Sequence, residues 1–554
     1  MILGIDLGTT NSLGCIFRDG KMQLIPNAFG DYLTPSVVGL DEDGQIVVGK
    51  VAKERLVTQS DLTVAKFKQF MGTDKLFYLG EKTYKPEELS SFIIRKLVDD
   101  AEAYLGQKVD EVVVSVPAYF NEAQRYATKL AAQLSGVPIE RIINEPSAAA
   151  LAQHFQYQEE EATYIVVDFG GGTLDISVVE AFDNVVEILA IAGDNHLGGE
   201  DFTQAIAQDF LKQQGLDTNL VSKELLNKTL VEAEKVKRDL NDQDQVDMKI
   251  VDKETVYQTT LTYQHFYEIS QDLLKRVKKV LDRALFDARY QQVSPNNFVL
   301  VGGTSKLRLV QEFLTYCIQQ PLGQPINPDT IIAKGCGLVA GIKERKEQVR
   351  DVMLSDICPF SLGIEVSNNG FSPIIERNTA LPVSKEEVYI TSSLGQTKVD
   401  IVVYQGENMQ ASKNFRLGNL VIPVPKNMEY HESFSVRFTY DLNGILDIDV
   451  RIHSTQEHFN KTILQNHVQL SPEEIKAKQA ELDKLKVRAQ DTEIYQFLIE
   501  KANRIYGLYV GPIRESIVKE TKRFQENVEK FSPMKRTRAY KEFSDYLDRL
   551  ERGY

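Results

Sequence analysis

The sequence has few of the features that mark secreted, membrane-spanning or zinc-binding proteins. Its 554 residues include only 4 cysteines and none lies in a CxxC spacing, so we expect reduced, buried thiols rather than a disulfide framework or a zinc site. No run of about 18 apolar residues occurs, which argues against a membrane-spanning helix. The opening MILGIDLGTT has no basic segment before a long apolar one, so we expect no signal peptide and a cytoplasmic protein.

The chain also lacks an excess of positive charge. It carries 64 Lys and Arg against 79 Asp and Glu, a formal net charge of -15, which gives no overall attraction to nucleic acid or an anionic membrane. With 42% hydrophobic and 26% charged residues, the composition is that of a folded globular chain. At roughly 150 residues per domain, the length predicts three or four domains.

The pattern of apolar residues divides the chain into successive regions. As far as about residue 348, short β-branched runs such as DEVVVSVPAYF alternate with helix-like stretches, which predicts an α/β architecture with both sheet faces covered. Residues 357–466 alternate with period two around Asn443-Gly444, which predicts an antiparallel β module with a hairpin. From Ser471 the pattern is helical, and Ser471-Pro472-Glu473-Glu474 predicts a helix start.

An apolar segment, DVMLSD, lies between the α/β region and the β module. Linkers between domains are usually polar. We therefore expect Val352, Met353 and Leu354 to bury their side chains against another part of the chain for part of the time.

A pattern near the start of the chain recurs in its second quarter. LGIDLGTTNS at 3–12 and VVDFGGGTLDIS at 166–177 share an apolar strand, an Asp, a glycine-rich turn and a Thr. This repeat predicts two similar lobes that face each other across a cleft. The alternative is a pair of unrelated strand–turn–strand units.

Each of these turns has the residues that bind a phosphate with a divalent cation. A strand-end carboxylate, Asp6 or Asp168, holds a metal directly or through water, and glycine lets the backbone N–H groups approach the phosphate closely. Two buried carboxylates facing one cleft would be costly without a cation, so the pair predicts a metal. The remaining residues of the two turns are Gly8, Thr9, Thr10, Asn11, Gly170, Gly171, Gly172, Thr173 and Asp175.

A third group of residues suits a nucleoside. Gly302, Gly303 and Thr304 follow a strand-like run, where small residues let a ring or a ribose approach the backbone. A helical segment presents four polar residues on one face, which alone would be an ordinary solvated face; with the glycine turn they could clasp adenosine. These are Glu234, Lys237, Arg238 and Asn241.

Taken in order, the motifs resemble those of one known family. DLGTTNS, VSVPAYFNEAQR, RIINEPSAAALA, VVDFGGGTLD, GDNHLGGEDF, VLVGGTSK, INPD and a DVMLSD-like linker follow one another as in DnaK-type chaperones of the heat-shock protein 70 family. The resemblance covers essentially the whole chain and continues into the β module at CPFSLGIEV and VYQGEN. The compact inserts and the phrase LIPNAFGDYLTPS resemble the HscC branch in particular.

The resemblance implies a multidomain chaperone. Its parts would be an actin-like, two-lobed α/β ATPase domain at 1–348, an apolar linker at 349–356, an antiparallel β-sandwich that binds peptides at 357–466, and a helical lid at 467–554. It implies ATP and ADP as ligands, with Mg²⁺ and also K⁺. Hydrolysis would switch the affinity for extended hydrophobic peptides through the linker. Partners would be unfolded polypeptide clients and a J-domain co-chaperone, with no nucleic acid or membrane.

Matched position by position, the resemblance also implies roles for single residues. Lys68 would contact the terminal phosphate and position water, Thr173 would bind the γ-phosphate, and Glu145 would align water or magnesium. Asp6, Asp168 and Asp175 would form the magnesium shell, largely through water. Further nucleotide contacts would come from Gly198, Gly199, Lys306 and Asp329.

The same matching implies residues for coupling and for peptide binding. Pro117 and Arg125 resemble a proline switch and its relay, and Arg141 and Asp356 resemble a pair where the linker and a J-domain partner dock. The peptide groove would be lined by Ile364, Val366, Tyr389, Val399 and Ile401, with Val399 under the central pocket; the alternative for each is ordinary sandwich core.

Several positions depart from the family pattern. Lys306 replaces an arginine that stacks on adenine, and lysine has no planar face for stacking. Asn241 replaces a serine, and Ser367 and Ser392 replace an apolar pair over the bound peptide. The stretch 241–262, where exchange factors bind, is short, so dependence on such a factor does not follow. These departures predict a specialised chaperone; the rival hypotheses are an actin-like small-molecule kinase and an actin-like filament protein.

Overall fold

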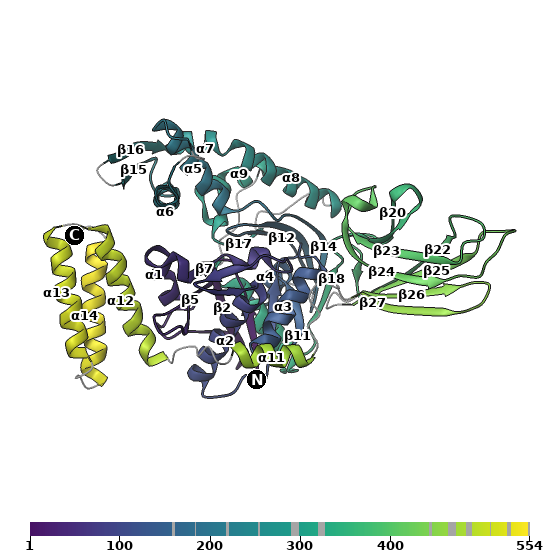
Figure 1. Ribbon diagram of the computed structural model, residues 1–554, viewed down its shortest axis with the longest axis horizontal. Helices are drawn as coiled ribbons and strands as arrows, with labels where there is room; N and C mark the ends of the chain where they lie inside the picture. Colours follow the sequence, from purple (N-terminus) through teal and green to yellow (C-terminus); the bar gives the residue numbers. More distant parts are fainter. Residues whose placement is uncertain are drawn as a thin grey trace. The chain divides into compact units, whose positions relative to one another are not determined.

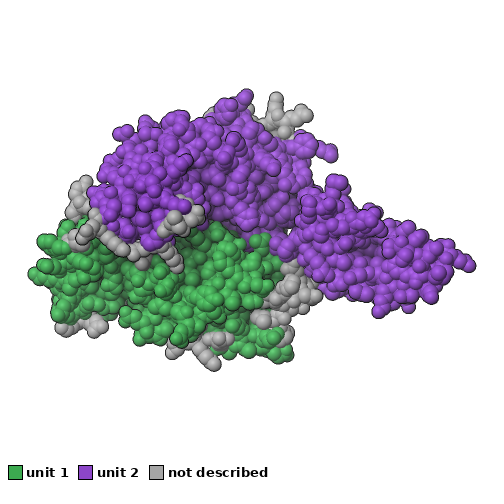
Figure 2. Space-filling view, turned by 45° about the horizontal axis from the view of Figure 1, so that its top comes forward, with its two compact units in different colours: residues 1–114, 123–142, 470–554 green, residues 115–122, 143–469 purple. Residues whose placement is uncertain are grey.

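The computed structural model describes most of the chain. The described residues are 1–157, 161–182, 184–217, 221–252, 255–289, 298–319, 327–441, 446–463, 472–482, 490–509, 511–528 and 533–551. They form two compact units (Figure 2): unit 1 comprises residues 1–114, 123–142 and 470–554, and unit 2 comprises 115–122 and 143–469. Among the described residues, no helix is long and apolar enough to cross a membrane.

The main sheet of the N-terminal region has the strand order β11-β10-β1-β2-β3, with β4 added beside β2. β1 pairs in parallel with β10 and antiparallel with β2. Runs such as EVVVSV in β10 are buried almost throughout, as expected for strands covered on both faces. The bounds are β1 Ile2–Asp6, β2 Asn11–Arg18, β3 Lys21–Ile25, β4 Thr34–Pro35, β10 Glu111–Val116 and β11 Ile139–Asn144.

Helices and two small sheets complete this half. α2 illustrates how the sequence sets its ends: Pro86 is its first residue, the Lys85 N–H donates to the Glu88 carboxylate at 2.7 Å, and Gly106 ends it with φ 65. The other elements are α1 Lys50–Thr58, α2 Pro86–Leu105, α3 Glu122–Leu134, β5 Val37–Leu40, β6 Ile46–Val48, β7 Thr63–Ala65, β8 Phe77–Leu79, β9 Lys82–Tyr84 and the 3₁₀ turn η2 Phe67–Phe70.

The main sheet of unit 2 repeats this arrangement, with the order β17-β12-β13-β14-β18-β21. β12, which ends at Phe169, pairs in parallel with β17 and antiparallel with β13, as β1 does with β10 and β2. The repeat predicted from the two Asp–Gly–Thr segments is therefore present in the topology of the two sheets. The bounds are β12 Glu161–Phe169, β13 Leu174–Phe182, β14 Val185–Asp194, β17 Phe298–Val301, β18 Met353–Ile357 and β21 Ala380–Leu381.

Helices cover this sheet, and a hairpin extends from them (Figure 1). α4 and α10 pack closely, since a Cβ on Gly335 would lie 2.0 Å from the carbonyl oxygen of Ala148. The elements are α4 Glu145–Tyr157, α5 Gly199–Gln213, α6 Lys223–Asp239, α7 Tyr263–Ile269, α8 Gln271–Asp287, α9 Arg308–Ile318, α10 Ile331–Lys343, β15 Gln245–Asp252 and β16 Thr255–Thr262.

The β module in unit 2 is a sandwich of two 4-stranded sheets, β20-β19-β23-β24 and β22-β25-β26-β27. The predicted antiparallel pairing is confirmed, and β25 and β26 pair on either side of the expected hairpin. Asn443 and Gly444 themselves lie outside the described residues. The bounds are β19 Leu362–Val366, β20 Gly370–Ile375, β22 Val383–Ile390, β23 Lys398–Gln405, β24 Phe415–Pro423, β25 Ser433–Tyr440, β26 Leu446–Ile452 and β27 His458–Ile463.

The C-terminal helices belong to unit 1. Pro472 is the first residue of α11 as predicted, whereas Ser471 lies outside the described residues. The later helices share a core that includes Leu498, Phe524 and Leu547. The bounds are α11 Pro472–Leu482, α12 Gln490–Leu508, α13 Pro512–Val528 and α14 Pro533–Glu551. Three cysteines are buried as expected, but Cys317 is only half-buried.

Candidate functional site

The second glycine turn, residues 170–173, joins β12 to β13 in unit 2. The Gly170 N–H donates to the Thr173 carbonyl at 3.0 Å, which closes the turn. Asp168 and Asp175 are directly opposite each other in the strand pair, and both are buried. Directly opposed residues project to the same face of a sheet, so the hairpin places two buried carboxylates next to each other.

Two further turns pack against this one. The Gly199 N–H donates to the Gly170 carbonyl at 3.1 Å, and the Thr304 Oγ1 donates to the same carbonyl at 2.7 Å. A Cβ on Gly302, whose φ is +81, would lie 2.5 Å from the Phe169 carbonyl oxygen. Only glycine allows such a close approach. Three segments predicted separately to bind a nucleotide are thus brought together in unit 2.

The polar residues of α6 lie beside these turns. Lys237 Nζ donates to the Gly199 carbonyl at 2.8 Å, to Thr203 Oγ1 at 2.9 Å and to the Glu234 carboxylate at 2.6 Å. Arg238 Nε donates to the other oxygen of Glu234 at 2.9 Å. Burial lowers the pKa of Lys237, and although burial alone would raise the pKa of Glu234, the Lys237 ammonium lowers it. Lys237 is therefore a buried member of a hydrogen-bonded cluster, while Arg238 at its edge is 70% exposed.

The other residues predicted to hold adenosine interact with each other or with the backbone. Asn241 accepts the Arg308 N–H at 2.9 Å, at the start of α9. Lys306 and Asp329 form an ion pair at 2.5 Å. A Cβ on Gly303 would meet open space. Lys306, where the family pattern has the stacking arginine, is thus held by a carboxylate from the INPD motif.

The first glycine turn belongs to unit 1. The Gly8 N–H donates to Ser12 Oγ at 3.1 Å, and Ser36 Oγ donates to the Gly8 carbonyl at 2.7 Å. A Cβ on Gly8 would lie 2.0 Å from the Asn11 carbonyl oxygen, so this turn also requires glycine. Asp6, at the end of β1, is 8% exposed, and Lys68, in η2, is 5% exposed. Asp6 and Gly8 are of the same residue types as Asp168 and Gly170 and have the same topological position in their sheet.

The predicted linker, residues 349–356, overlaps β18, which is a strand of the main sheet of unit 2. It pairs in parallel with β14, with Met353 opposite Val185 and Leu354 opposite Val186. The Met353 N–H donates to the Asn184 carbonyl at 2.7 Å. In this structure Val352 and Leu354 are half-buried, whereas Met353 is 62% exposed; docking of all three side chains for part of the time stays a prediction. The backbone of β18 and the half-buried Leu354 make the contact with β14.

Asp356, at the far end of β18, contacts the segment that carries Glu145. Asn144 Nδ2 donates to Asp356 Oδ2 at 2.7 Å, and Glu145 is the next residue and the first of α4. Motif matching did not single out Asn144, although it lies inside RIINEPSAAALA. Arg141, the predicted partner of Asp356, belongs to unit 1, so that pairing stays a prediction.

The whole chain matches one protein family. The family described as Hsp70 protein matches residues 2–77 and 75–549. The chain belongs to the Hsp70 family. It is 36% identical to chaperone protein DnaK of Thermosipho melanesiensis over 91% of this chain and 89% of that protein, and 37% identical to chaperone protein DnaK of Thermosipho africanus over 91% and 88%. Chaperone protein DnaK of Thermotoga neapolitana is 36% identical over 86% and 82%.

These matches confirm an ATP-dependent chaperone with ATPase activity, and with it the predicted fold of a two-lobed α/β part, a β-sandwich and C-terminal helices. They give no support to the small-molecule kinase or the filament protein. The resemblance to the HscC branch stays a prediction, as do the four domain boundaries.

The residues predicted to line the peptide groove of this Hsp70 chain fall into two groups. Ile364 and Ile401 belong to the buried core of the sandwich. Val366, Tyr389 and Val399 are partly buried against that core, and Tyr389 has a hydroxyl contact with Ser372 at 3.1 Å. The two predicted arch residues, Ser367 and Ser392, are exposed. The groove remains a prediction, with the partly buried group as its accessible part.

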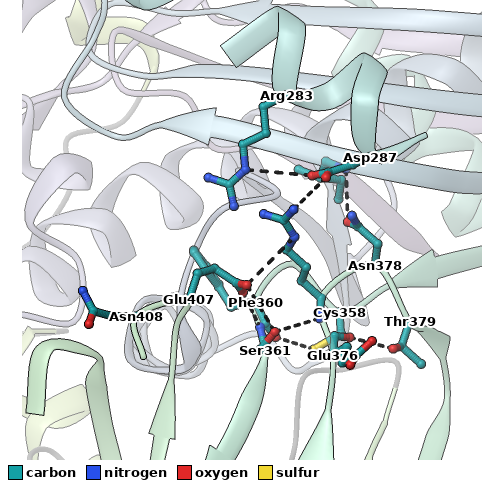
Figure 3. A network of polar contacts seen from close by, with 12 residues as sticks. Arg283, Asp287, Cys358, Phe360, Ser361, Glu376, Asn378, Thr379, Glu407 and Asn408 are labelled. Atoms are coloured by element: carbon teal, nitrogen blue, oxygen red, sulfur yellow. Dashed lines mark hydrogen bonds and ion pairs between the residues drawn. The ribbon is translucent and has the colours of Figure 1, made fainter. Parts of the chain in front are cut away.

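A polar network in unit 2 joins α8 to the β module (Figure 3). Arg377 donates to the buried carboxylate of Asp287 at 2.6 Å, and Arg283 lies 3.9 Å from the other oxygen of Asp287. Glu407 accepts the Ser361 N–H at 2.8 Å. Nearby, the ring centroids of Tyr119 and Phe360 are 4.2 Å apart. Tyr119 lies two residues after Pro117. The sequence analysis assigned no role to Asp287 or to Arg377, although Arg377 lies inside the family-like motif FSPIIERNTALPVS.

Unit 1 holds a second set of contacts that the sequence analysis missed. Phe497 of α12 packs edge-on against Phe29 at 5.3 Å, within a cluster that includes residues of α1. Four charged side chains of the C-terminal helices also pair with opposite charges in the N-terminal part of unit 1. The pairs are Arg504 with Glu54 at 2.5 Å, Glu493 with Lys96 at 3.1 Å, Lys478 with Glu88 at 2.7 Å, and Glu500 with Arg55.

Proposed function

We propose that this Hsp70 chain uses ATP to switch the rate at which its β module exchanges extended hydrophobic polypeptide segments, with β18 as the connection. One observation carries the proposal. β18 is a strand of the sheet that bears the Asp168 turn, and it leads directly into the β module through its pairing with β21. A single segment is therefore a strand of the nucleotide sheet and directly precedes β19, the first strand of the sandwich, in the sequence.

Each of the two glycine turns is proposed to contact phosphates of ATP. In unit 2 residues 170–173 pack against Gly198 and Gly199, where a Cβ would lie 2.2 Å from the Gly171 carbonyl oxygen and 2.4 Å from Thr304 Oγ1. We propose that the backbone of these turns forms a cradle for a chain of phosphates. Glu234 and Lys237 hold the neighbouring turn from α6, where the nucleoside would lie. Thr9, Thr10 and Asn11 would contribute the equivalent donors from unit 1. Thr173 and Lys68 are proposed to contact the terminal phosphate.

The residues present also fit a divalent cation. Asp168 and Asp175 are buried and adjacent, and Asp6 has the same strand-end position in the repeated turn. Among the described residues, no group of three or more His, Cys, Asp or Glu side chains is arranged to hold a metal. We therefore infer that the three aspartates would hold Mg²⁺ mainly through water and the phosphates. When bound, Mg²⁺ would neutralise charge on the phosphates. K⁺ rests on the family resemblance alone.

Hydrolysis would proceed by in-line attack of water on the terminal phosphate. The side chains would have little covalent chemistry to do, so catalysis would come from positioning and charge neutralisation. Glu145, at the start of α4, is proposed to orient the water. Its neighbour Asn144 donates to Asp356 of β18, so a shift near the terminal phosphate has a direct route to the linker.

The docked and undocked states of the linker are expected to have nearly equal free energies. Ordering a residue costs about 1–2 kcal/mol, while each backbone hydrogen bond contributes about 0.5–1.5 kcal/mol net. Half-burying Leu354 adds about 1 kcal/mol. Over the few residues of β18 these terms nearly cancel, so a nucleotide that prefers one state by a few kcal/mol can decide which is populated.

The partners are proposed from the membership of the chain in the Hsp70 family. Clients would be unfolded or extended polypeptides, and a J-domain co-chaperone would act near β18. The cytoplasm is the proposed location. The exposed Ser367 and Ser392, in place of an apolar arch, favour a specialised client range.

The test is the dissociation rate of a fluorescent leucine-rich peptide, measured with and without ATP. We expect ATP to accelerate dissociation at least about fivefold, as a coupling of about 1–3 kcal/mol implies. An off-rate that ATP leaves unchanged would refute the proposal. Sugar-dependent release of ADP, or ATP-dependent polymerisation in the ultracentrifuge, would favour the kinase or the filament instead.

A further inference from the structure

The turn that follows β14, residues 194–199, determines where the phosphate cradle lies. In addition to the bond between Gly199 and Gly170, the Glu200 N–H donates to the Gly171 carbonyl at 2.9 Å. A Cβ on Gly198 would lie 2.2 Å from the oxygen of that same carbonyl. The two backbones are therefore packed closely together and joined by two hydrogen bonds. A displacement of residues 194–199 therefore displaces residues 170–172, which lead into Thr173.

Arg276, on α8, holds the first part of this turn. Its Nε and one Nη donate to the same oxygen of Asp194, at 3.0 and 2.8 Å. The same Nη donates to the His196 carbonyl at 2.8 Å, and the other Asp194 oxygen accepts the His196 N–H at 3.0 Å. The planar guanidinium has donors at fixed angles, so it holds a carboxylate and a carbonyl of one turn at the same time.

The last part of the turn is held from another helix. Lys237 of α6 donates to the Gly199 carbonyl at 2.8 Å. Two cations, one on α6 and one on α8, thus contact the two ends of the turn. Lys237 belongs to the predicted adenosine clasp, whereas Arg276 matches no nucleotide-binding motif.

We propose that Arg276 is a positioning residue for ATP hydrolysis. It acts through the Asp194 turn rather than on the reacting atoms, and keeps the Gly170–Thr173 turn where the terminal phosphate needs it. The opposing interpretation is a surface ion pair of little consequence, because the side chains of Arg276 and Asp194 are 39% and 24% exposed. Three donated hydrogen bonds to a single turn, two of them to one carboxylate oxygen, favour the positioning role.

The first experiment measures single-turnover ATP hydrolysis and ATP affinity separately. Arg276→Ala is expected to slow hydrolysis about tenfold, since a small misplacement of reacting groups has effects of this size or larger. The dissociation constant for ATP should change by less than about threefold, because the binding groups remain. Arg276→Lys should recover part of the rate. Lys275→Gln is the matched control. Lys275 directly precedes Arg276 on α8, its side chain is 72% exposed, and it pairs with Asp272, which is 92% exposed.

The second experiment separates positioning from folding. Because the site is partly exposed, free guanidinium ion at millimolar concentration should enter the space left in Arg276→Ala and raise its hydrolysis rate, while sodium chloride at the same ionic strength should not. A chain that is merely destabilised would not respond in this way. Two results would overturn the proposal: a wild-type hydrolysis rate in Arg276→Ala, or a loss of rate that follows a lower melting temperature and that neither lysine nor guanidinium restores. Both readouts concern hydrolysis, so they are independent of whether ATP accelerates peptide release.

Discussion

The two neighbouring side chains in β18 should respond very differently to the same substitution. Leu354 is half-buried opposite Val186, which is 0% exposed, whereas Met353 is 62% exposed. An aspartate at 354 loses about 1 kcal/mol of apolar burial and places a carboxylate against apolar surface, at a further cost of about 1–3 kcal/mol. The sum, about 3 kcal/mol, shifts the equilibrium toward the undocked linker by roughly a hundredfold. An aspartate at 353 points into solvent, so its effect should stay within about 0.5 kcal/mol.

The assay is the peptide off-rate with and without ATP, in wild type, Leu354→Asp and Met353→Asp. Both variants should bind ATP and peptide. We expect ATP to accelerate peptide release in wild type and Met353→Asp, and to have little effect in Leu354→Asp. Equal acceleration in all three would make β18 a passive tether. If both variants lost the acceleration by ATP equally, the solvent exposure of a side chain in β18 would not decide whether it couples the nucleotide sheet to the β module.

Three further predictions concern the chemical step, the groove and the C-terminal helices. Thr173→Ala and Lys68→Ala should each slow single-turnover hydrolysis by at least about 100-fold, with ATP affinity within a few-fold, because positioned charge is lost; unchanged rates would remove both residues from the site. Val399→Phe should weaken binding of a leucine-rich peptide at least about tenfold by overfilling the pocket, with basal ATPase intact; normal binding would place the groove elsewhere. Burial raises the pKa of Glu493 above its ordinary 4.5, although Lys96 opposes this. Glu493 therefore binds a proton more readily when α12 is docked than when the helix is free, so docking of α12 should strengthen as the pH falls through this raised pKa toward 4.5. Hydrogen exchange of α12 should show this pH dependence in wild type but not in Glu493→Gln. An identical pH response in the two proteins would contradict the prediction.

Much of the candidate site could be predicted from the sequence because its determinants are local. A strand-end aspartate, a glycine turn and a threonine lie within a few residues of each other, and the requirement for glycine follows from backbone geometry that neighbouring residues fix. This is why the repeat at Asp6 and Asp168 predicted two sheets of the same topology. Period-two alternation predicted the antiparallel sandwich for the same reason, since side chains alternate between faces whatever lies beyond the strand.

The alternation could not separate a groove residue from a core residue. Ile364 and Ile401 point inward like Val399, and all three are apolar at the same period. Only the packed sandwich shows that the first two are buried and the third is partly exposed. In the same way, an apolar run predicted that the linker docks, but strand register decided that Leu354 is half-buried and that Met353 is exposed.

What the sequence determined by itself is therefore the family, the duplicated turns and the residue types that can bind a nucleotide. Tertiary structure alone decided the pairings between distant charges: Arg276 with Asp194, Arg377 with Asp287, and Glu493 with Lys96. A charged residue on a helix looks the same in the sequence whether its side chain faces water or an opposite charge. Its partner is far away in the sequence and is not found at any regular spacing from it. Such pairs form only when folding brings two helices, or a helix and a turn, within a few ångströms, and this is where the positioning of the phosphate turn is decided.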